Sequence, residues 1–184
     1  MNHKRKGFTL LELIIVVGIL GVVMTITSSF FFSGYFNMNK TEKKLDLQRN
    51  MEVVVRQLEI VIKSSVEVNT IDKNGTMVYG FISNIKKNNG INPESFIYYK
   101  DSNSKLQSSS KMHPEGTDLI DDMGTLYDPS INEVICDNVE SFEIKRSSDG
   151  DFLEVKIVLK DSFRGEDIKE EYSGRIYMRN QKDK

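Results

Sequence analysis

The hydrophobic positions of this chain follow three patterns in succession. Residues 13–39 carry no formal charge, and as a helix this stretch would measure about 40 Å, more than the roughly 30 Å hydrocarbon core of a bilayer. From about residue 47 to residue 66 the apolar residues recur at helical spacing, and beyond residue 70 they alternate with polar ones. The pattern therefore predicts a membrane-spanning helix, an amphipathic continuation and a β-rich region.

The amphipathic stretch is expected to continue the same helix. No proline occurs before Pro93, so we expect one helix over residues 8–66. Glycine and asparagine are weak helix formers, which makes residues 33–34 and 37–39 the places where a bend is expected. Because the heptad is short and irregular, the apolar stripe is expected to pack under a sheet of the same chain, with a coiled-coil seam or a partner-binding stripe as the alternative. The stripe consists of Leu47, Met51, Val54, Val55, Leu58, Ile62 and Val66.

In the β-rich region, clusters of glycine, asparagine, serine and proline separate the alternating segments. Residues 108–132, which begin with three consecutive serines, are the least regular part. Toward the C-terminus apolar and charged residues alternate, which predicts an antiparallel meander with one face packed and the other in solvent. The expected strands are 76–82, 96–99, 105–107, 139–144, 153–159 and 172–178, with breaks at 73–75, 88–90, Pro93, 101–104, 147–151 and 164–167.

Charged residues flank the start of the apolar segment. Lys4, Arg5 and Lys6 precede it, and the positive-inside bias would hold this end in the cytoplasm and send the rest of the chain outward. Glu12 lies one turn inside the segment, where an unpaired carboxylate at mid-bilayer costs about 2.5–3.5 kcal/mol. Because of this cost, we expect the carboxylate of Glu12 to have a partner group.

The segment Lys-Gly-Phe-Thr-Leu-Leu-Glu-Leu at residues 6–13 resembles the class III signal of type IV prepilins and type II secretion pseudopilins. The resemblance implies that a membrane aspartyl peptidase cuts after Gly7 and methylates the new N-terminal residue, Phe8. It also implies that Glu12, fifth in the mature chain, pairs with the N-terminal amine of a neighbouring subunit during assembly. Cleavage would create an ammonium in the apolar zone, and a buried charge is tolerable when another charge matches it at close range.

Other types of N-terminal signal fit less well. A conventional secretory signal needs small residues at its cleavage site, and the chain contains no alanine. A lipoprotein signal needs a cysteine just after the apolar region, and the single cysteine is Cys136. An uncleaved signal anchor stays open as the alternative.

The resemblance implies the type IV pilin fold, an α+β fold in which one long N-terminal helix packs against an antiparallel β-sheet head. Within that helix the membrane span begins at Leu13 and ends at Phe32. The parts of the chain are then a leader peptide at 1–7, a transmembrane and filament-core half-helix at 8–36, an amphipathic half-helix at 37–68 and a globular head at 69–184.

The last third of the chain is similar to the heads of minor pilins and pseudopilins of the W and J types and of their Gram-positive competence counterparts. The similar segments are residues 138–142, 149–151, 153–155 and 172–177. The long helix also lacks the prolines that many major pilins carry, which favours a minor subunit. Residues 70–132 resemble no family.

Composition and charge narrow the remaining possibilities. The 184 residues suffice for an anchor and one modest domain, and a single cysteine allows no intrachain disulfide. Cys136 follows Val134 and Ile135, so we expect a small hydrophobic residue buried in a strand. The net charge of −2 and the lack of a concentrated basic patch with aromatic residues give no reason to expect nucleic acid as a partner, although DNA uptake stays open.

Local motifs give no sign of catalysis. His113 is the one histidine beyond the leader, and no Ser-His-Asp, Cys-His, HExxH or glycine-rich phosphate-binding motif is recognisable. We therefore expect no enzyme, cofactor or catalytic residue. Calcium is left open as a ligand of a carboxylate-rich loop, with solvent-exposed carboxylates as the plainer interpretation. The residues concerned are Asp118, Asp121, Asp122 and Asp128.

The sequence thus predicts a minor pilin or pseudopilin subunit, cut after Gly7 and assembled into a type IV pilus, a secretion pseudopilus or a competence filament. The expected partners are the prepilin peptidase, other pilin or pseudopilin subunits, an assembly platform protein with its ATPase, and membrane lipid. The expected location is the inner or cytoplasmic membrane as a single-pass protein with the head outside, and then a filament. The alternative is an extracellular binding or sensory protein on an uncleaved anchor, in which Glu12 would be incidental.

Overall fold

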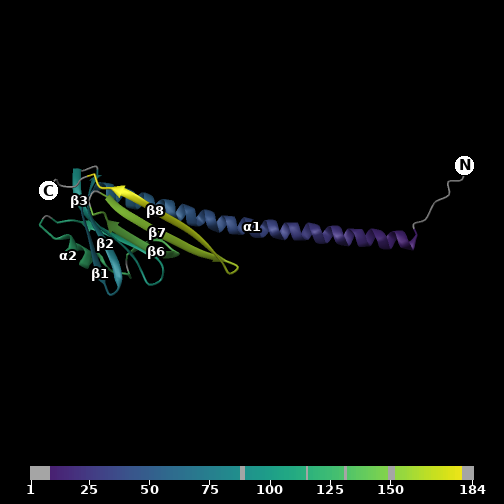
Figure 1. Ribbon diagram of the computed structural model, residues 1–184. Helices are drawn as coiled ribbons and strands as arrows, with labels where there is room; N and C mark the ends of the chain where they lie inside the picture. The colour runs from purple at the N-terminus through teal and green to yellow at the C-terminus, as the bar shows by residue number, and fades with distance from the viewer. Residues whose placement is uncertain (1–8, 88–89, 115, 131, 149–151, 180–184) are drawn as a thin grey trace. The chain divides into compact units, whose positions relative to one another are not determined.

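The computed structural model describes residues 9–87, 90–114, 116–130, 132–148 and 152–179, with the side chains of residues 85–92 left out. The chain forms two units, residues 1–42 and residues 43–184. The first unit consists of the N-terminal part of helix α1, which spans Leu10–Ser64. The second contains the rest of that helix and every strand (Figure 1).

Helix α1 passes through both positions where a bend was expected without a break in its helical structure. Thr41 Oγ1 donates to Asn37 O (2.8 Å), which keeps that turn hydrogen-bonded. The helix ends at Ser64, two residues before the expected end, because serine hydroxyls donate hydrogen bonds to the backbone carbonyls of its last turns. Ser64 Oγ donates to Ile60 O (2.7 Å) and Ser65 Oγ to Val61 O (2.6 Å).

The head contains two antiparallel sheets, and the α+β class with one long helix is confirmed. A five-stranded sheet has the strands in chain order, and a three-stranded sheet forms the C-terminal meander that the alternation predicted. A short helix, α2, spans Leu119–Leu126. The strands are β1 (Ser65–Lys73), β2 (Thr76–Lys87), β3 (Gly90–Lys100), β4 (Leu106–Met112) and β5 (Glu133–Cys136) in the first sheet, and β6 (Val139–Arg146), β7 (Phe152–Phe163) and β8 (Glu166–Tyr177) in the second.

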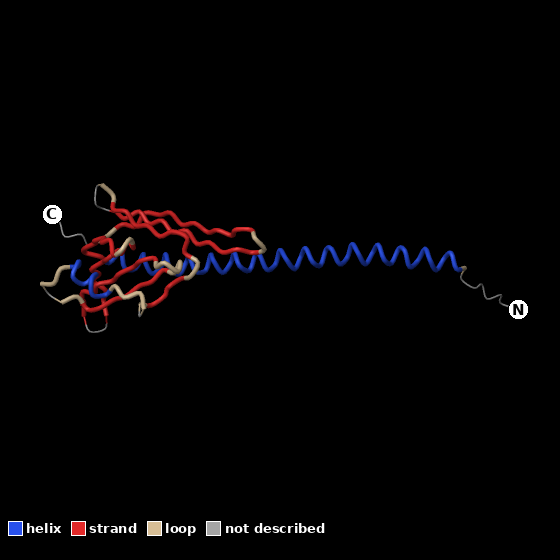
Figure 2. The backbone as a smooth tube through the Cα atoms, turned by 90° about the horizontal axis from the view of Figure 1, so that it is seen from below, coloured by secondary structure: helices blue, strands red, loops and turns tan. Residues whose placement is uncertain are grey.

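The apolar stripe of α1 lies between the two sheets and forms the main core (Figure 2). Leu58 and Ile62 have no exposed surface, and they share a cluster with Phe81 of the first sheet and Ile157 of the second. The prediction that this stripe packs inside its own chain is confirmed. Val66 is the exception, because it belongs to β1 and packs in a second cluster.

Helix α2 covers the other face of the five-stranded sheet and was not predicted. Its Leu119 and Met123 are fully buried against Val78 and Ile97. Gly80 of β2 makes room for this packing, because a Cβ atom there would overlap the side chain of Met123. Figure 1 shows α2 on the side of this sheet away from β6, β7 and β8.

The expected turns at residues 73–75 and 164–167 are confirmed as tight hairpin turns. Asn74 and Gly75 have φ angles of 55° and 82°, and Arg164 and Gly165 have the same values. Two consecutive residues with positive φ are characteristic of two-residue hairpins, whose twist suits the flanking strands. The strands flanking each turn are accordingly paired without a bulge next to the turn, Lys73 with Thr76 and Phe163 with Glu166.

Two expectations for the middle of the chain are wrong. Pro93 was expected to break the chain but lies within β3, paired in register with Asn84 of β2. Its carbonyl accepts a hydrogen bond from His113 N (3.0 Å), so the backbone polar groups of Pro93 point away from β2. On that side β4 has already ended at Met112. The N–H that proline lacks is therefore not needed for the hydrogen bonds between β2 and β3. Ser108, Ser109 and Ser110, expected to be irregular, form the centre of β4.

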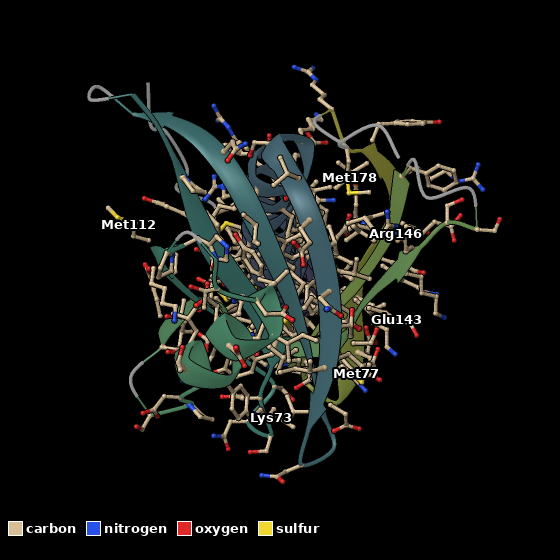
Figure 3. All side chains as sticks on the ribbon, turned by 90° about the vertical axis from the view of Figure 1, so that its left-hand side faces the viewer. Lys73, Met77, Met112, Glu143, Arg146 and Met178 are labelled. Carbon is tan, nitrogen blue, oxygen red and sulfur yellow. The ribbon has the colours of Figure 1, made fainter. Side chains whose placement is uncertain are left out.

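Figure 3 shows how the two sheets enclose the head portion of α1. Met112 at the end of β4 and Arg146 at the end of β6 lie on opposite sides of the head. The alternation predicted for the meander is confirmed along β7. Its Val155 and Ile157 are buried toward the helix, while Glu154 and Lys156 are exposed on the outer face.

Candidate functional site

The first turn of α1 is closed by a reciprocal pair of hydrogen bonds between Thr9 and Glu12. Thr9 N donates to Glu12 Oε2 (3.0 Å), and Glu12 N donates to Thr9 Oγ1 (3.3 Å). The Thr9 hydroxyl also donates to Glu12 Oε2 (3.2 Å). Leu13 N then makes the first helical bond, to Thr9 O (3.3 Å). This is a capping box, in which an N-cap threonine and a glutamate three residues later satisfy each other's backbone amides.

The capping box gives Glu12 partners within its own chain. A carboxylate at a helix N-terminus is favoured by the helix dipole and by the free amides of the first turn, which offsets part of the cost of placing it at the edge of an apolar segment. The partner that the resemblance implies for Glu12 lies in a neighbouring subunit, and these partners within the chain were not predicted. The Thr-x-x-Glu spacing of residues 9–12 was the signal that could have revealed it.

The segment that follows Glu12 has the properties of a membrane span. Large apolar side chains cover its surface, for example Leu13 (61% exposed) and Phe32 (62% exposed), the two predicted ends of the span. Two hydroxyls within it bond to helix carbonyls, Thr25 Oγ1 to Gly21 O and Thr27 Oγ1 to Val23 O, both at 2.8 Å. By length and composition α1 can cross a bilayer, in which polar groups must find partners within the protein.

Gly7 and Phe8, the residues predicted to flank the cleavage site, lie outside the described residues. The structure begins to describe the chain at Thr9, the second residue after the predicted cut. Of the predicted processing and assembly site, the structure therefore describes only Glu12 and the start of the helix that carries it.

The comparison with protein families bears on this same segment. Residues 2–28 match the family model described as the prokaryotic N-terminal methylation motif. This prepilin-type motif is characteristic of type IV pilins and pseudopilins, so the resemblance inferred from residues 6–13 is confirmed. No curated protein and no solved structure matches the chain.

The long apolar helix, the antiparallel sheets and this motif are features that the chain shares with type IV pilin-like prepilins. The motif implies processing by a prepilin peptidase and assembly with other pilins, and such proteins are structural subunits. The motif and the single apolar N-terminal helix fit a single-pass, membrane-anchored protein. The match ends at residue 28, so it covers none of the head.

The head contains a buried cluster that no local sequence motif indicated. Asp122 of α2 is 1% exposed, and its Oδ1 lies 2.7 Å from Lys111 Nζ of β4. Its Oδ2 accepts from the Ser95 hydroxyl and lies 2.6 Å from His113 Nδ1. Burial alone would raise the pKa of this carboxyl, but Lys111, Ser95 and His113 outweigh that effect and hold the pKa of Asp122 below its usual value.

Although serine, histidine and aspartate meet in this cluster, their geometry is not that of a catalytic triad. In a triad the histidine stands between the other two and uses a different ring nitrogen for each. Here His113 Nδ1 faces both the Ser95 hydroxyl (3.0 Å) and Asp122, and Ser95 bonds directly to Asp122 and has no exposed surface. The cluster instead ties α2 to β3 and β4.

Three of the four carboxylates considered as calcium ligands have other roles. Asp118 caps α2 by accepting from Ile120 N (3.1 Å), and Asp128 accepts from the backbone and the hydroxyl of Ser130. With Asp122 paired to Lys111, the loop does not present its oxygens to a common point. Among the residues that the structure describes, no group of three or more His, Cys, Asp or Glu side chains is placed to hold a metal ion.

Cys136 ends β5 and is 4% exposed, as expected for a small buried hydrophobic residue. Burial, with a smaller contribution from Asp137, raises the pKa of its thiol to about 11. The thiol is therefore protonated near neutral pH and is a poor nucleophile.

Proposed function

We propose that this chain is cut after Gly7, methylated at Phe8 and assembled as a subunit of a type IV pilus, a secretion pseudopilus or a competence filament. The observation that supports the proposal best is the prepilin-type motif over residues 2–28, followed by a helix whose first turn holds Glu12. In this proposal residues 1–7 are the leader, residues 8–36 the transmembrane and filament-core segment, residues 37–68 the amphipathic helical segment and residues 69–184 the head.

Each residue of the N-terminal site has a distinct part in the proposal. Gly7 allows the peptidase close access to the bond, and Phe8 supplies the new amine. Glu12 exchanges its contacts with Thr9 for the amine of a neighbouring subunit, so that two charges in an apolar environment neutralise each other. The segment from Leu13 to Phe32 remains in the membrane until an assembly ATPase and its platform protein extract the subunit.

Within this class we propose a minor subunit with a head of the W or J type. Its support is the similarity of the C-terminal segments, which form the β6, β7 and β8 meander, and a long helix without proline. The N-terminus then faces the cytoplasm before assembly, and the head lies outside the membrane.

Mass spectrometry of the N-terminal peptide, from cells with and without the prepilin peptidase, tests the proposal. We expect a mature chain that begins with N-methylated Phe8 when the peptidase is present. When the peptidase is absent, we expect an unprocessed chain. A chain that keeps Met1 in both strains would instead indicate a permanent anchor that carries an extracellular binding or sensory head.

The Glu12→Ala variant tests the role of the carboxylate separately. We expect it to insert into the membrane and to be cut like the wild type, but to be missing from sheared filaments. Glu42→Ala is the matched control, because Glu42 lies on the same helix beyond the apolar segment. Normal incorporation of Glu12→Ala into filaments would contradict the assigned role.

A further inference from the structure

A groove of about 640 Å³ runs between α1 and the edge strand β8 in the head. Its floor is apolar, made by Met51 and Val55 of the helix and Tyr172 of the strand. Acidic side chains line it, Glu52 and Glu59 from α1 and Glu170 from β8, with Arg56 as the one basic residue and Gln48 as the remaining polar one.

The acidic side chains of the groove are only partly neutralised. Glu59 Oε2 pairs with Lys63 Nζ (2.7 Å). The side chains of Glu52 and Glu170 form no hydrogen bond or ion pair with any residue that the structure describes, and neither does that of Arg56. The groove therefore carries uncompensated negative charge beside an apolar floor, which favours a ligand that is apolar and basic.

The face of the same helix that points away from the head core carries exposed apolar residues. Leu45, Val53 and Ile60 are 46%, 50% and 55% exposed, although the head buries the other face of α1. They are spaced eight and seven residues apart and so lie on one face of the helix, within about 80° of one another, with the exposed Arg49 between the first two. We refer to Leu45, Arg49, Val53 and Ile60 as the outer stripe.

We propose that the outer stripe of one copy of this chain docks in the α1–β8 groove of a second copy. The inference rests on the proposed function, because it places the contact between neighbouring subunits of a filament. Apolar residues of the stripe would cover Met51, Val55 and Tyr172. Arg49, whose Nη1 lies 3.7 Å from the exposed Asp46 Oδ1 of its own chain, would turn from that contact to Glu52 and Glu170 of the neighbour. Charge and hydrophobic character match in the same contact.

The direction of the groove supports a neighbour in the same orientation. The β7–β8 hairpin lies at the start of the head portion of α1, since Lys43 Nζ is 2.9 Å from Asp161 Oδ2. Just beyond the end of β8, Arg179 N donates to Lys63 O (3.2 Å). Strand β8 thus runs beside α1 in the same direction, and a second α1 laid in the groove lies along both elements, parallel to the first when two chains share one membrane topology.

The proposed contact joins two different surfaces of the chain. A row of copies therefore keeps one free groove at one end and one free stripe at the other. A contact of this kind does not close into a symmetric dimer and can repeat along a filament.

Cysteine cross-linking between two differently tagged full-length chains, coexpressed in cells that process and assemble the protein, tests the contact. One chain carries Val53→Cys in the outer stripe and the other Glu170→Cys at the rim of the groove. The native Cys136 can stay, because it is buried and its raised pKa keeps it protonated. Ile120→Cys on α2, 46% exposed, is the matched control for Val53→Cys.

We expect a mixed cross-link between the Val53→Cys and Glu170→Cys chains that is at least several-fold stronger than the one between Ile120→Cys and Glu170→Cys. Arg49→Glu should reduce its yield about two- to five-fold, as for an exposed ion pair, and Glu52→Arg combined with Glu170→Cys should restore part of it. Equal yields from Ile120→Cys and Val53→Cys, or no mixed cross-link at all, would overturn the inference.

The same samples separate this inference from the proposed function. N-terminal mass spectrometry and the presence of the chain in sheared filaments report on processing and assembly. A processed, filament-associated chain without the mixed cross-link would refute the α1–β8 contact alone, whereas an unprocessed chain would refute the proposed function.

Discussion

Thr9 and Glu12 cap the long helix by exchanging backbone hydrogen bonds, Thr9 N to Glu12 Oε2 at 3.0 Å and Glu12 N to Thr9 Oγ1 at 3.3 Å. Serine can replace threonine in this arrangement, because it keeps the hydroxyl, whereas valine cannot. Thr9→Val should therefore weaken the first turn of α1 by about 0.5–2 kcal/mol, and Thr9→Ser should leave it nearly unchanged.

Amide hydrogen exchange of the full chain in detergent micelles measures this difference. The amides of residues 10–13 should exchange faster in Thr9→Val than in the wild type and in Thr9→Ser. Exchange in the turn around Thr41, far along the same helix, serves as the internal reference. Identical exchange in the valine and serine variants would show that the capping box does not stabilise the helix.

The buried Asp122 predicts how the stability of the head depends on pH. Its pKa is lower in the folded chain than in the unfolded chain, so its ionised form stabilises the fold above the unfolded value of about 3.9. This stabilisation is lost as the pH falls through the folded pKa. Wild-type protein should therefore lose stability more steeply below about pH 4 than Asp122→Asn does.

At neutral pH Asp122→Asn should be less stable than the wild type by about 1.5–3 kcal/mol, the range for hydrogen bonds to a charged group. A larger loss is not expected, because Lys111 keeps 34% of its side chain exposed and can stay hydrated. Urea unfolding of the detergent-solubilised chain between pH 3 and 7, followed by circular dichroism, gives both quantities. Asp121→Asn, on the exposed face of the same helix, is the control and should resemble the wild type at every pH.

The parts of the fold that followed from the sequence are those with local signals. A long charge-free run, helical spacing from Leu47 to Ile62 and strict alternation along β7 each produce the element that they predict. The N-terminal motif was found for the same reason, since its meaning lies in eight consecutive residues. The capping box within it was not predicted, although its Thr-x-x-Glu spacing is an equally local signal.

The parts that could not be predicted depend on contacts between distant residues. Ser95, Lys111 and Asp122 come from three elements and His113 from the loop after β4, and the four form one cluster only when α2 packs on the sheet. Similarly, Pro93 is compatible with a strand only because β4 ends opposite it. The division of the head into two sheets also depends on which strands pair, and nothing in the alternation of β5 and β6 distinguishes them.

The main core provides a prediction with a matched control on the same helix. Leu58 has no exposed surface and lies between the two sheets, so Leu58→Ala removes apolar contacts and leaves a cavity. Its unfolding free energy should fall by about 2–5 kcal/mol. Ile60→Ala, two residues away and 55% exposed, should change stability by less than about 0.5 kcal/mol in an isolated subunit. Thermal or urea unfolding in micelles measures the stability of both variants, and equal effects would contradict the burial of Leu58 between the two sheets.

The fit of α2 on the five-stranded sheet depends on Gly80, because any Cβ atom at this position overlaps the side chain of Met123. Gly80→Ala should be partly accommodated by rotation of the flexible methionine, whereas Gly80→Val should cost about 1–3 kcal/mol, as overpacking usually does. Shortening the methionine should relieve the overlap, so Gly80→Val with Met123→Ala should be less destabilised than the sum of the single variants. Urea unfolding of the wild type, Gly80→Val, Met123→Ala and the double variant completes the double-mutant cycle. Strict additivity would mean that Met123 does not pack on Gly80, and α2 would then have to be held by the Asp122 cluster and its other apolar contacts alone.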